Sequence, residues 1–244
     1  TVSRALRGAT NVTEETRIKV QRAADQLNFT LSKSASALAS GKTMRVILLV
    51  SGKLNEWFNS GVLQGVYEEL APVGYDVTPA FITDRSELDR FFSQLPKSRN
   101  ADAIIISSFQ LMPAMRDQLQ AIDLPTVGVN VPAESGYFDA SISIDNSSAM
   151  TMAVRLLRSL GHTNIAFCSD YIPADMVYNT SQRTQAFADA AQANATDGIT
   201  FSLLTADAHD APLSKSDLAS QLTAKLLSLP ERPTAVCVFL LPVH

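Results

Sequence analysis

Apolar and polar positions follow two different periods along most of the chain. From Arg45 onward, short runs of consecutive apolar residues such as RVILLV and DAIIIS are separated by stretches in which apolar residues recur every three or four positions. The first pattern predicts buried strands and the second predicts amphipathic helices. Strands are expected at 46–50, 75–81, 103–107, 126–130, 141–144, 164–168, 199–204 and 234–239. Helices are expected at 58–71, 86–95, 112–121, 146–160, 180–193 and 215–229.

The alternation of these elements predicts an α/β fold with parallel sheets covered on both faces by helices. In open parallel sheets, ligands bind beyond the carboxyl ends of the strands. Functional side chains are therefore expected at the strand ends, just after Val50, Ser107, Asn130, Ile144 and Ser169.

The first 42 residues have a different pattern. A helix over 1–6 is expected to stop at Gly8, and Thr13 is expected to cap a second helix that carries Glu14 and Glu15 in its first turn. Residues 30–42 (TLSKSASALASGK) are rich in Ser and Ala. After Leu31, Leu38 is the one large apolar residue of this stretch. Such a segment is too weakly apolar to hold a helix alone in water, so a linker is expected.

Charge is unevenly distributed between the start of the chain and the rest. Residues 1–45 carry eight Lys and Arg against three acids, a net of +5, which leaves −9 for residues 46–244 out of a total of −4. A basic end on an acidic body is typical of a nucleic-acid-binding module joined to a domain with another task. A solvated helix without a partner would have the same charge, so the sequence around the charges has to decide between them.

Cysteine use and hydropathy narrow the remaining classes. Cys168 and Cys237 have no metal-ligand or redox spacing and lie in apolar strands, so they are expected to be reduced core residues. No apolar run approaches the length that spans a membrane, and the first residues do not resemble a secretory signal. A cytoplasmic protein without membrane contact, bound metal or cofactor is expected.

Several motifs occur together in a fixed order. They are TVSRALRGATNVTEETRIKVQRAADQLNF at 1–29, SKSASALASGKT at 32–43, Phe58 after the first strand, the pair Asp145-Asn146, LGHTNI at 160–165, and Arg183 four residues before Phe187. With these motifs the chain resembles the lactose-repressor (LacI/GalR) family over essentially its whole length.

The resemblance implies a type I periplasmic-binding-protein-like body of two lobes, preceded by a partial all-α helix-turn-helix headpiece. The expected domains are the headpiece at 1–29, a hinge helix or linker at 30–43, the N-terminal lobe of the effector domain at 44–161, and an incomplete C-terminal lobe at 162–244.

The resemblance also places candidate DNA contacts in the headpiece and the linker. A recognition helix offers short polar and basic side chains to the major groove, and Arg4 suits a bidentate contact to guanine. Val2 and Leu6 are then expected in the headpiece core. The hinge is expected to insert Leu38 between base pairs in the minor groove. Each polar residue is otherwise an ordinary surface residue, and Leu38 otherwise packs on its own lobe. The expected DNA-binding residues are Thr1, Ser3, Arg4, Arg7, Asn11, Thr13, Thr16, Ala35 and Leu38.

A second set of candidates is expected to line a ligand cleft between the lobes. Aromatic faces stack on the C–H face of a sugar, and the resemblance implies that Arg183 grips hydroxyl or carboxylate groups as a fork of donors. Structural alternatives stay open here: Asn146 is expected to be a helix cap, Asp145 only orients the chain, and Trp57 is a core aromatic. The expected effector-binding residues are Asn55, Trp57, Phe58, Ser107, Asp145, Ser148 and Arg183.

Both ends depart from the family pattern. The chain opens inside an expected helix, and it reads FLLPVH where the family continues with an Asn-Asp or Ser-Asp pair and a further helix. The sequence is therefore expected to be truncated at both ends, as a fragment, a frameshifted product or the product of a degenerate gene. A full ligand response is not expected from these residues alone.

Three function classes follow from the sequence. The first is a DNA-binding regulator, expected to be a repressor, whose partners are double-stranded operator DNA, a small effector implied to be a carbohydrate, and a second copy of the chain. The homodimer is expected because one headpiece reads half of a palindrome. The second class is a receptor-like solute-binding protein without DNA function, against which the recognition-helix residues count. The third, an α/β enzyme, is not expected, since the chain has no phosphate-loop, GxGxxG, nucleophile-elbow or HExxH motif.

Overall fold

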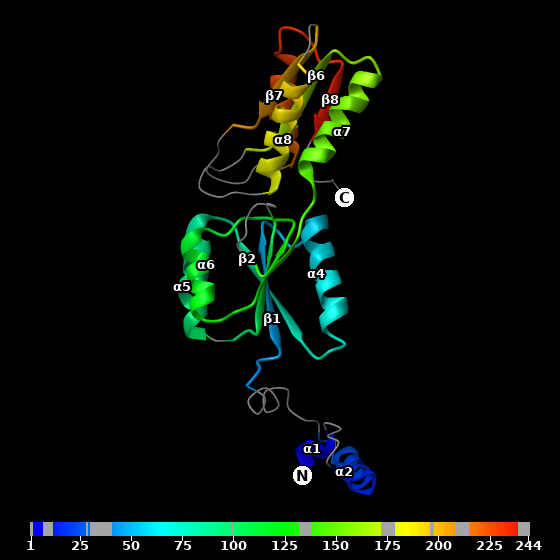
Figure 1. Ribbon diagram of the computed structural model, residues 1–244, viewed down its shortest axis with the longest axis vertical. Coiled ribbons are helices and arrows are strands. Elements are labelled where there is room, and N and C mark those ends of the chain that lie inside the picture. Colours follow the sequence, from blue (N-terminus) through cyan, green and yellow to red (C-terminus); the bar gives the residue numbers. More distant parts are fainter. Residues whose placement is uncertain are drawn as a thin grey trace.

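The structure is a computed structural model that describes residues 2–6, 12–27, 29, 41–98, 100–131, 138–171, 179–195, 198–207 and 215–238. A pair of helices is followed by two sheets with helices on their faces (Figure 1). The helices are α1 (Val2–Leu6), α2 (Glu14–Gln26), α4 (Trp57–Leu70), α5 (Arg85–Ser98), α6 (Pro113–Ala121), α7 (Asn146–Ser159), α8 (Asn179–Ala193) and α9 (Lys215–Leu227). The strands are β1 (Arg45–Ser51), β2 (Asp76–Ile82), β3 (Ala103–Ser107), β4 (Thr126–Val129), β5 (Ala140–Ile142), β6 (Asn164–Ser169), β7 (Thr200–Thr205) and β8 (Ala235–Val238).

The first sheet has the strand order β2-β1-β3-β4-β5, and its described pairings are parallel. β1 lies between two neighbours and is fully buried at Leu48 and Leu49, which explains its unbroken apolar sequence. Pro79 lies in β2 at the edge of the sheet, where a residue without an N–H costs no ladder hydrogen bond.

Helices cover the two faces of this sheet. α4 lies on one side, and α5 and α6 lie on the other (Figure 1). Phe92 of α5 and Leu119 of α6 are both almost fully buried, in one apolar cluster with Leu49, Ile104 and other strand residues. This cluster is the main core of the first half of the body.

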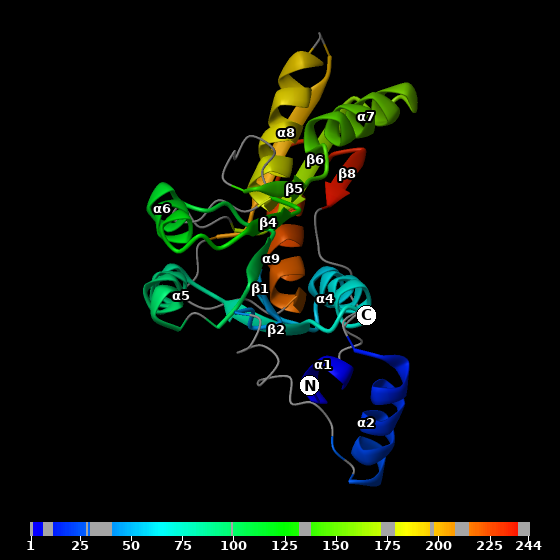
Figure 2. The same ribbon diagram turned by 60° about the horizontal axis from the view of Figure 1, so that its bottom comes forward.

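The second sheet has the order β7-β6-β8, with parallel pairing on both sides of β6. Successive strand residues point to opposite faces, so Phe167 and Cys168 of β6 enter different cores. Phe167 packs with Val154 of α7 and Phe187 of α8. Cys168 packs with Leu218 and other residues of α9, which lies on the opposite face (Figure 2).

The predicted α/β class with parallel sheets is confirmed. The described strands and helices follow the predicted order, and most ends shift by one or two residues. α5 ends at Ser98 rather than at the predicted 95. Among the strands β5 differs most: it is predicted over 141–144 and found at Ala140–Ile142, and its three residues are exposed. The alternating Ser and Ile of this segment is a weak signal because β5 lies at a sheet edge. The predicted end of the last strand, at 239, lies outside the described residues.

The domain boundaries stay a prediction, but the packing of α7 bears on one of them. A boundary between residues 161 and 162 assigns α7 to the first lobe. Val154 of α7 is fully buried against the second sheet, beside Ile165 and Phe187. The packing therefore favours a boundary just before Asn146.

The carboxyl ends of the strands in the two sheets point toward each other (Figure 1). The N-terminal ends of α7 and α8 lie on the side of the second sheet that faces the first sheet. Because ligand sites of parallel sheets form at such strand ends, this arrangement brings together the segments in which effector contacts were expected.

Candidate functional site

The helical pair at the start of the chain is held by a small apolar contact. Ala5 of α1 and Ala24 of α2 are both buried, at 2% and 6% exposure. Val2, expected in this core, is 54% exposed, so that prediction is wrong for the structure described. Ala5, which was not predicted in this core, is buried instead of Val2, and Leu6, the other residue predicted there, is half-buried.

Thr13 caps α2 as predicted. Its side chain accepts a hydrogen bond from the backbone N–H of Thr16 at 3.4 Å, and the two threonine hydroxyls lie 2.8 Å apart. Glu14 and Glu15 lie in the first turn as expected, where their negative charges interact favourably with the positive end of the helix dipole. Both threonines are at or near the surface, in a position from which hydroxyl donors can reach a phosphate.

The basic side chains of α2 are partly engaged with acids of the same helix. The guanidinium Nη1 of Arg17 lies 3.2 Å from Glu14 Oε2, and Lys19 Nζ lies 2.8 Å from Glu15 Oε1. Exposed pairs of this kind are weak and screened by salt, so a phosphate can compete for the cations.

The remaining DNA-binding candidates are only partly described. Ser3 and Arg4 lie in α1, and the structure describes their backbone but not their side chains. The other candidates, Thr1, Arg7, Asn11, Ala35 and Leu38, lie wholly outside them.

Two strand ends of the first sheet meet at a small polar cluster. Ser107 is completely buried at the end of β3, and its hydroxyl lies 3.4 Å from that of Ser108. Asn130, which follows β4, donates from its amide to the Ser108 hydroxyl at 3.3 Å. Ser108 and Asn130 both have positive φ, 72° and 53°, in a region that side chains with a Cβ rarely adopt.

Asn130 was missed as a site residue from the sequence, although its place at a strand end was recognised. The signal that marks it is this left-handed backbone, because strained residues concentrate at ligand sites. Sequence alone gives only the strand end.

The aromatic candidates lie in the first turn of α4, just after the loop that follows β1. α4 begins at Trp57, and the Trp57 and Phe58 rings meet edge to face with centroids 5.7 Å apart. Trp57 is 48% exposed, so it is a surface aromatic rather than a core one. Asn55 is exposed in the turn before it. This leaves an aromatic surface that a sugar ring can stack on.

A second missed residue, Asn59, shapes that loop. Its buried side-chain amide donates to the carbonyl oxygens of Ser51 and Lys53, at 2.8 and 3.0 Å. A buried amide that satisfies two loop carbonyls fixes the path of the chain between β1 and α4. Asn59 therefore positions Trp57 and Phe58.

The start of α7 corrects the expected roles of two neighbouring residues. Asp145, and not Asn146, is the N-cap: its carboxylate accepts the Ser148 N–H at 2.9 Å and the Ser148 hydroxyl at 2.6 Å. The hydrogen bonds from Ser148 hold the pKa of Asp145 below its ordinary value. Asp145 and Ser148, both expected to contact a ligand, thus also bind each other.

Asn146 is instead a partner of Arg183. Asn146 is buried, and its side-chain oxygen accepts a hydrogen bond from Arg183 Nε at 2.9 Å. Arg183 is half-buried near the start of α8, and burial lowers its pKa. An arginine stays charged in proteins even so. The contact joins α7 to α8 and fixes the direction of a cationic fork on the side of the second sheet that faces the first.

The candidate effector residues are thus divided between the two sheets. Asn55, Trp57, Phe58 and Ser107 come from the first sheet and its loops, while the second-sheet set is Asp145, Ser148 and Arg183. A ligand that contacts both sets spans the space between the sheets.

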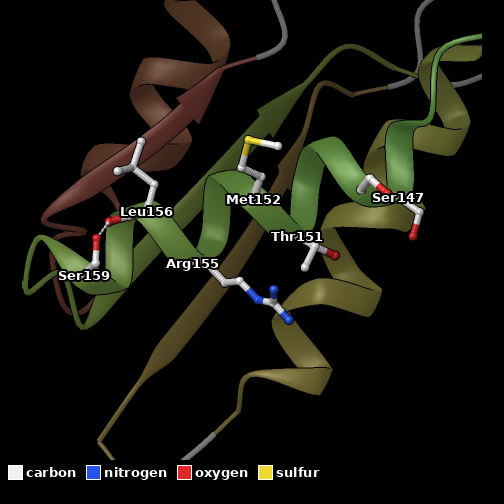
Figure 3. Close-up of a pocket in the computed structure, with 7 residues that line it drawn as sticks. Ser147, Thr151, Met152, Arg155, Leu156 and Ser159 are labelled. Carbon is white, nitrogen blue, oxygen red and sulfur yellow. Dashed lines mark hydrogen bonds between the residues drawn. The ribbon is translucent and has the colours of Figure 1, made fainter.

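A separate groove runs along α7. It has a volume of about 640 Å³ and is formed by one helix, as Figure 3 shows. Its lining residues are Ser147, Ser148, Thr151, Met152, Arg155, Leu156 and Ser159. Ser148 is the one effector candidate among them. The Ser159 hydroxyl is bonded to the carbonyl of Leu156 at 2.8 Å, within the helix itself. A groove made by one helix surface does not enclose a ligand.

Two kinds of feature are absent from the part of the chain that the structure describes. Within those residues, no three His, Cys, Asp or Glu side chains are grouped so that they could hold a metal ion. Among the same residues, no helix is long and apolar enough to cross a bilayer.

Comparison with curated proteins finds DNA-binding regulators, while no protein-family model matches the chain. The chain is 27% identical over 190 residues to the HTH-type transcriptional regulator AglR of Rhizobium meliloti (strain 1021), covering 75% of this chain and 51% of that regulator. It is 28% identical over 242 residues to the HTH-type transcriptional repressor PurR of Vibrio cholerae, covering 98% of this chain and 68% of PurR. The chain therefore spans between half and about two thirds of the length of these relatives.

Solved structures show the same fold. The lac repressor dimer bound to operator and the anti-inducer ONPF has a TM-score of 0.76 at 20% identity, covering 97% of this chain and 68% of that one. The transcriptional regulator CelR in complex with cellobiose has a TM-score of 0.59 at 24% identity, covering 98% of this chain and 69% of that one.

The fold and the helical pair define a two-lobed body of the periplasmic-binding-protein-like type, preceded by part of a helix-turn-helix headpiece. In sequence and in fold the chain is thus similar to regulators of the lactose-repressor (LacI/GalR) family.

Proposed function

We propose that this chain is part of a DNA-binding transcription regulator, a repressor in its simplest form, whose affinity for operator DNA is controlled by a small ligand. The observation that carries the proposal is the Arg183–Asn146 hydrogen bond, which holds a guanidinium on the side of the second sheet facing the first. The same chain begins with a helical pair whose second helix is capped by Thr13 and carries basic side chains. Its matched relatives are regulators and not enzymes, which supports a non-catalytic role.

The proposed ligand is a carbohydrate that spans the two sheets. Trp57 offers an exposed aromatic face for the C–H side of a sugar, and Arg183 offers directed donors for its hydroxyl groups. Ser107 and the Ser108–Asn130 pair add polar groups at the opposite strand ends. CelR, a relative in fold, is known in complex with cellobiose, which supports this class of ligand.

The proposed mechanism is a population shift in a cytoplasmic homodimer. A ligand that contacts both sheets favours one relative position of the lobes, and the linkers of two copies order together on DNA in only one of these positions. Two headpieces then read the two halves of a palindrome, and Leu38 is proposed to enter the minor groove. The lac repressor dimer bound to operator is a precedent for this assembly.

The ligand half of this proposal is tested by thermal unfolding of the full chain with cellobiose and a panel of monosaccharides. A bound sugar at about 100 times its Kd stabilises the fold by about 2.7 kcal/mol, which raises Tm by about 5 to 10 °C in a chain of this size. Arg183→Ala is expected to abolish that shift, measured from the variant's own Tm. Arg155→Ala, in the outer groove of α7, is the matched control and should keep it.

Arg183→Lys separates charge from geometry. Lysine keeps the cation but lacks the planar fork and the Nε donor to Asn146, so a reduced shift is expected. A full shift in Arg183→Ala for a sugar that stabilises the unaltered chain contradicts the assignment of this site.

A further inference from the structure

The carboxylate of Asp102 accepts three hydrogen bonds from the segment at which the linker enters the body. Asp102 Oδ1 accepts the backbone N–H of Thr43 at 2.7 Å and the Thr43 hydroxyl at 2.9 Å. Its Oδ2 accepts the backbone N–H of Met44 at 2.9 Å. Asp102 directly precedes β3, so the contact spans 58 to 59 residues of sequence.

Backbone hydrogen bonds complete this attachment on both sides. Asp102 N–H donates to the Arg45 carbonyl at 2.8 Å, and Asp76 N–H donates to the Met44 carbonyl at 2.9 Å. The residues just before β1 are thus tied to the first residue of β2 and to the residue that precedes β3. This is the point where the segment at 30–43, expected to be the linker, reaches the first sheet.

Met44 shows that the attachment imposes a conformation on the chain. Its φ is +53°, in the left-handed region that residues with a Cβ rarely adopt. Such a conformation persists where the surroundings over-determine it, and here the surroundings are the Asp102 carboxylate and the N–H of Asp76.

We propose that Asp102 is a positioning residue that latches the end of the linker to the first lobe and so sets the point from which the headpiece is presented to DNA. The role in presenting the headpiece rests on the proposed DNA-binding function, whereas the attachment of the linker by Asp102 does not. Without the latch, residues 43 and 44 keep the two backbone bonds and the covalent link to β1 but lose three hydrogen bonds to the lobe, so a change in lobe position reaches the linker less directly.

The same sheet contains a matched control for Asp102. Asp139 also accepts a threonine N–H and the hydroxyl of the same residue, from Thr126 at 2.7 and 2.9 Å. This second contact joins the starts of β4 and β5, on the opposite edge of the sheet from β2. Asp139→Asn therefore measures the cost of losing such a contact to the lobe, without touching the linker.

The first test measures the latch directly in the full chain. Asp102→Asn places an NH₂ donor against the Met44 N–H, or against both Thr43 donors if the amide is turned. Hydrogen exchange of the Thr43 and Met44 amides, and tryptic cleavage after Lys42, are expected to accelerate at least about tenfold. Asp139→Asn should leave both rates within about twofold. Unchanged exchange and cleavage in Asp102→Asn would overturn the latch.

The second test measures its effect on DNA. Duplexes are first selected from a random library with the unaltered chain, and their affinity for each variant is then measured. Asp102→Asn is expected to lose about tenfold in affinity for the selected duplex while keeping its affinity for unrelated DNA, which depends on charge. Asp139→Asn should keep both affinities. Equal affinity of both variants for the selected duplex overturns the positioning role.

Two further outcomes keep the result interpretable. If Asp102→Asn does not fold, Thr43→Val removes only one of the three bonds, and Thr126→Val is its control; faster exchange in the first variant alone supports the latch, and equal exchange overturns it. If the unaltered chain selects no duplex, the proposed function fails and the DNA role of Asp102 fails with it, while hydrogen exchange still decides whether Asp102 holds the linker.

Discussion

At the scale of single residues, neighbouring polar side chains at the start of α7 have separate tasks. Asp145 satisfies the first turn of the helix, whereas Asn146, one residue later, turns inward and accepts the Arg183 Nε–H. If Asn146 lost this partner, its buried amide would be desolvated without a compensating hydrogen bond, which destabilises the fold. The direction of Arg183 therefore depends on a residue that need not touch a ligand.

Acid is expected to destabilise the first lobe through its two carboxylate contacts. Burial raises the pKa of Asp102, but hydrogen bonds from Thr43 and Met44 outweigh burial, so the pKa lies below its ordinary value. Hydrogen bonds from Thr126 lower the pKa of Asp139 in the same way. The unfolded state then binds more protons than the folded state in acid, so stability is present above the ordinary pKa and is lost as pH falls through the folded value.

Urea unfolding of the full chain at pH 7 and at about pH 3 checks this expectation. The free energy of unfolding should be lower at pH 3, and the Asp102→Asn, Asp139→Asn double variant should show a smaller loss between the two pH values. An equal loss in the double variant would show that other carboxylates carry the effect.

At the scale of elements, an aromatic cluster holds α8 against the second sheet. Phe187 of α8 is 1% exposed, stacks on Phe167 of β6 with centroids 4.8 Å apart, and meets Phe201 of β7 edge to face at 6.1 Å. Phe187 lies about one turn beyond Arg183, on a helix whose position sets where the guanidinium points.

Phe187→Ala is expected to lower the free energy of unfolding by about 3 to 5 kcal/mol, since it leaves a cavity between α8 and the sheet. Leu203→Ala on β7, where the side chain is 46% exposed, is the control and should cost clearly less. Denaturant unfolding of both variants makes the comparison. Equal losses would mean that this cluster is not a core of the second lobe.

Most of the fold was predictable from sequence because its central strands, β1, β3 and β6, are largely buried. β1 and β3 are runs of consecutive apolar residues, which indicate buried strands. In the helices that flank them, apolar residues recur every three or four positions. β5 was placed less well, since an exposed edge strand leaves little hydrophobic signal. The packing of α7 with the second sheet depends on contacts of Val154 across the chain, which no local pattern reveals.

The candidate site was predictable in its residue types but not in its pairings. Strand ends pointed to Ser107, and Arg183 was identified through the family resemblance. Periodicity does not show that Asn146 binds Arg183, because the two lie 37 residues apart and meet only when α7 and α8 pack. Asn59 was missed for a different reason: its partners lie only six and eight residues away, but they are backbone carbonyls, which no side-chain pattern marks.

At the scale of the whole molecule, the charge distribution and the architecture agree. The net +5 of residues 1–45 is carried by the helical pair, the linker and Arg45 at the start of β1, and the net −9 of residues 46–244 by the rest of the body (Figure 1). An acidic body does not itself attract DNA, so binding to a duplex has to come from the basic start of the chain.

The central claim is tested most directly by the salt dependence of binding to a double-stranded DNA of arbitrary sequence, measured by fluorescence anisotropy with the full chain. We expect binding at about 50 mM salt, with log affinity falling linearly as log salt rises. Exchanging both Arg4 and Arg7 for Gln should weaken binding and reduce that slope by about 1 to 2, whereas Arg155→Gln on α7 should leave the slope unchanged. No binding of the unaltered chain at low salt, or an equal slope in all three proteins, would contradict the account.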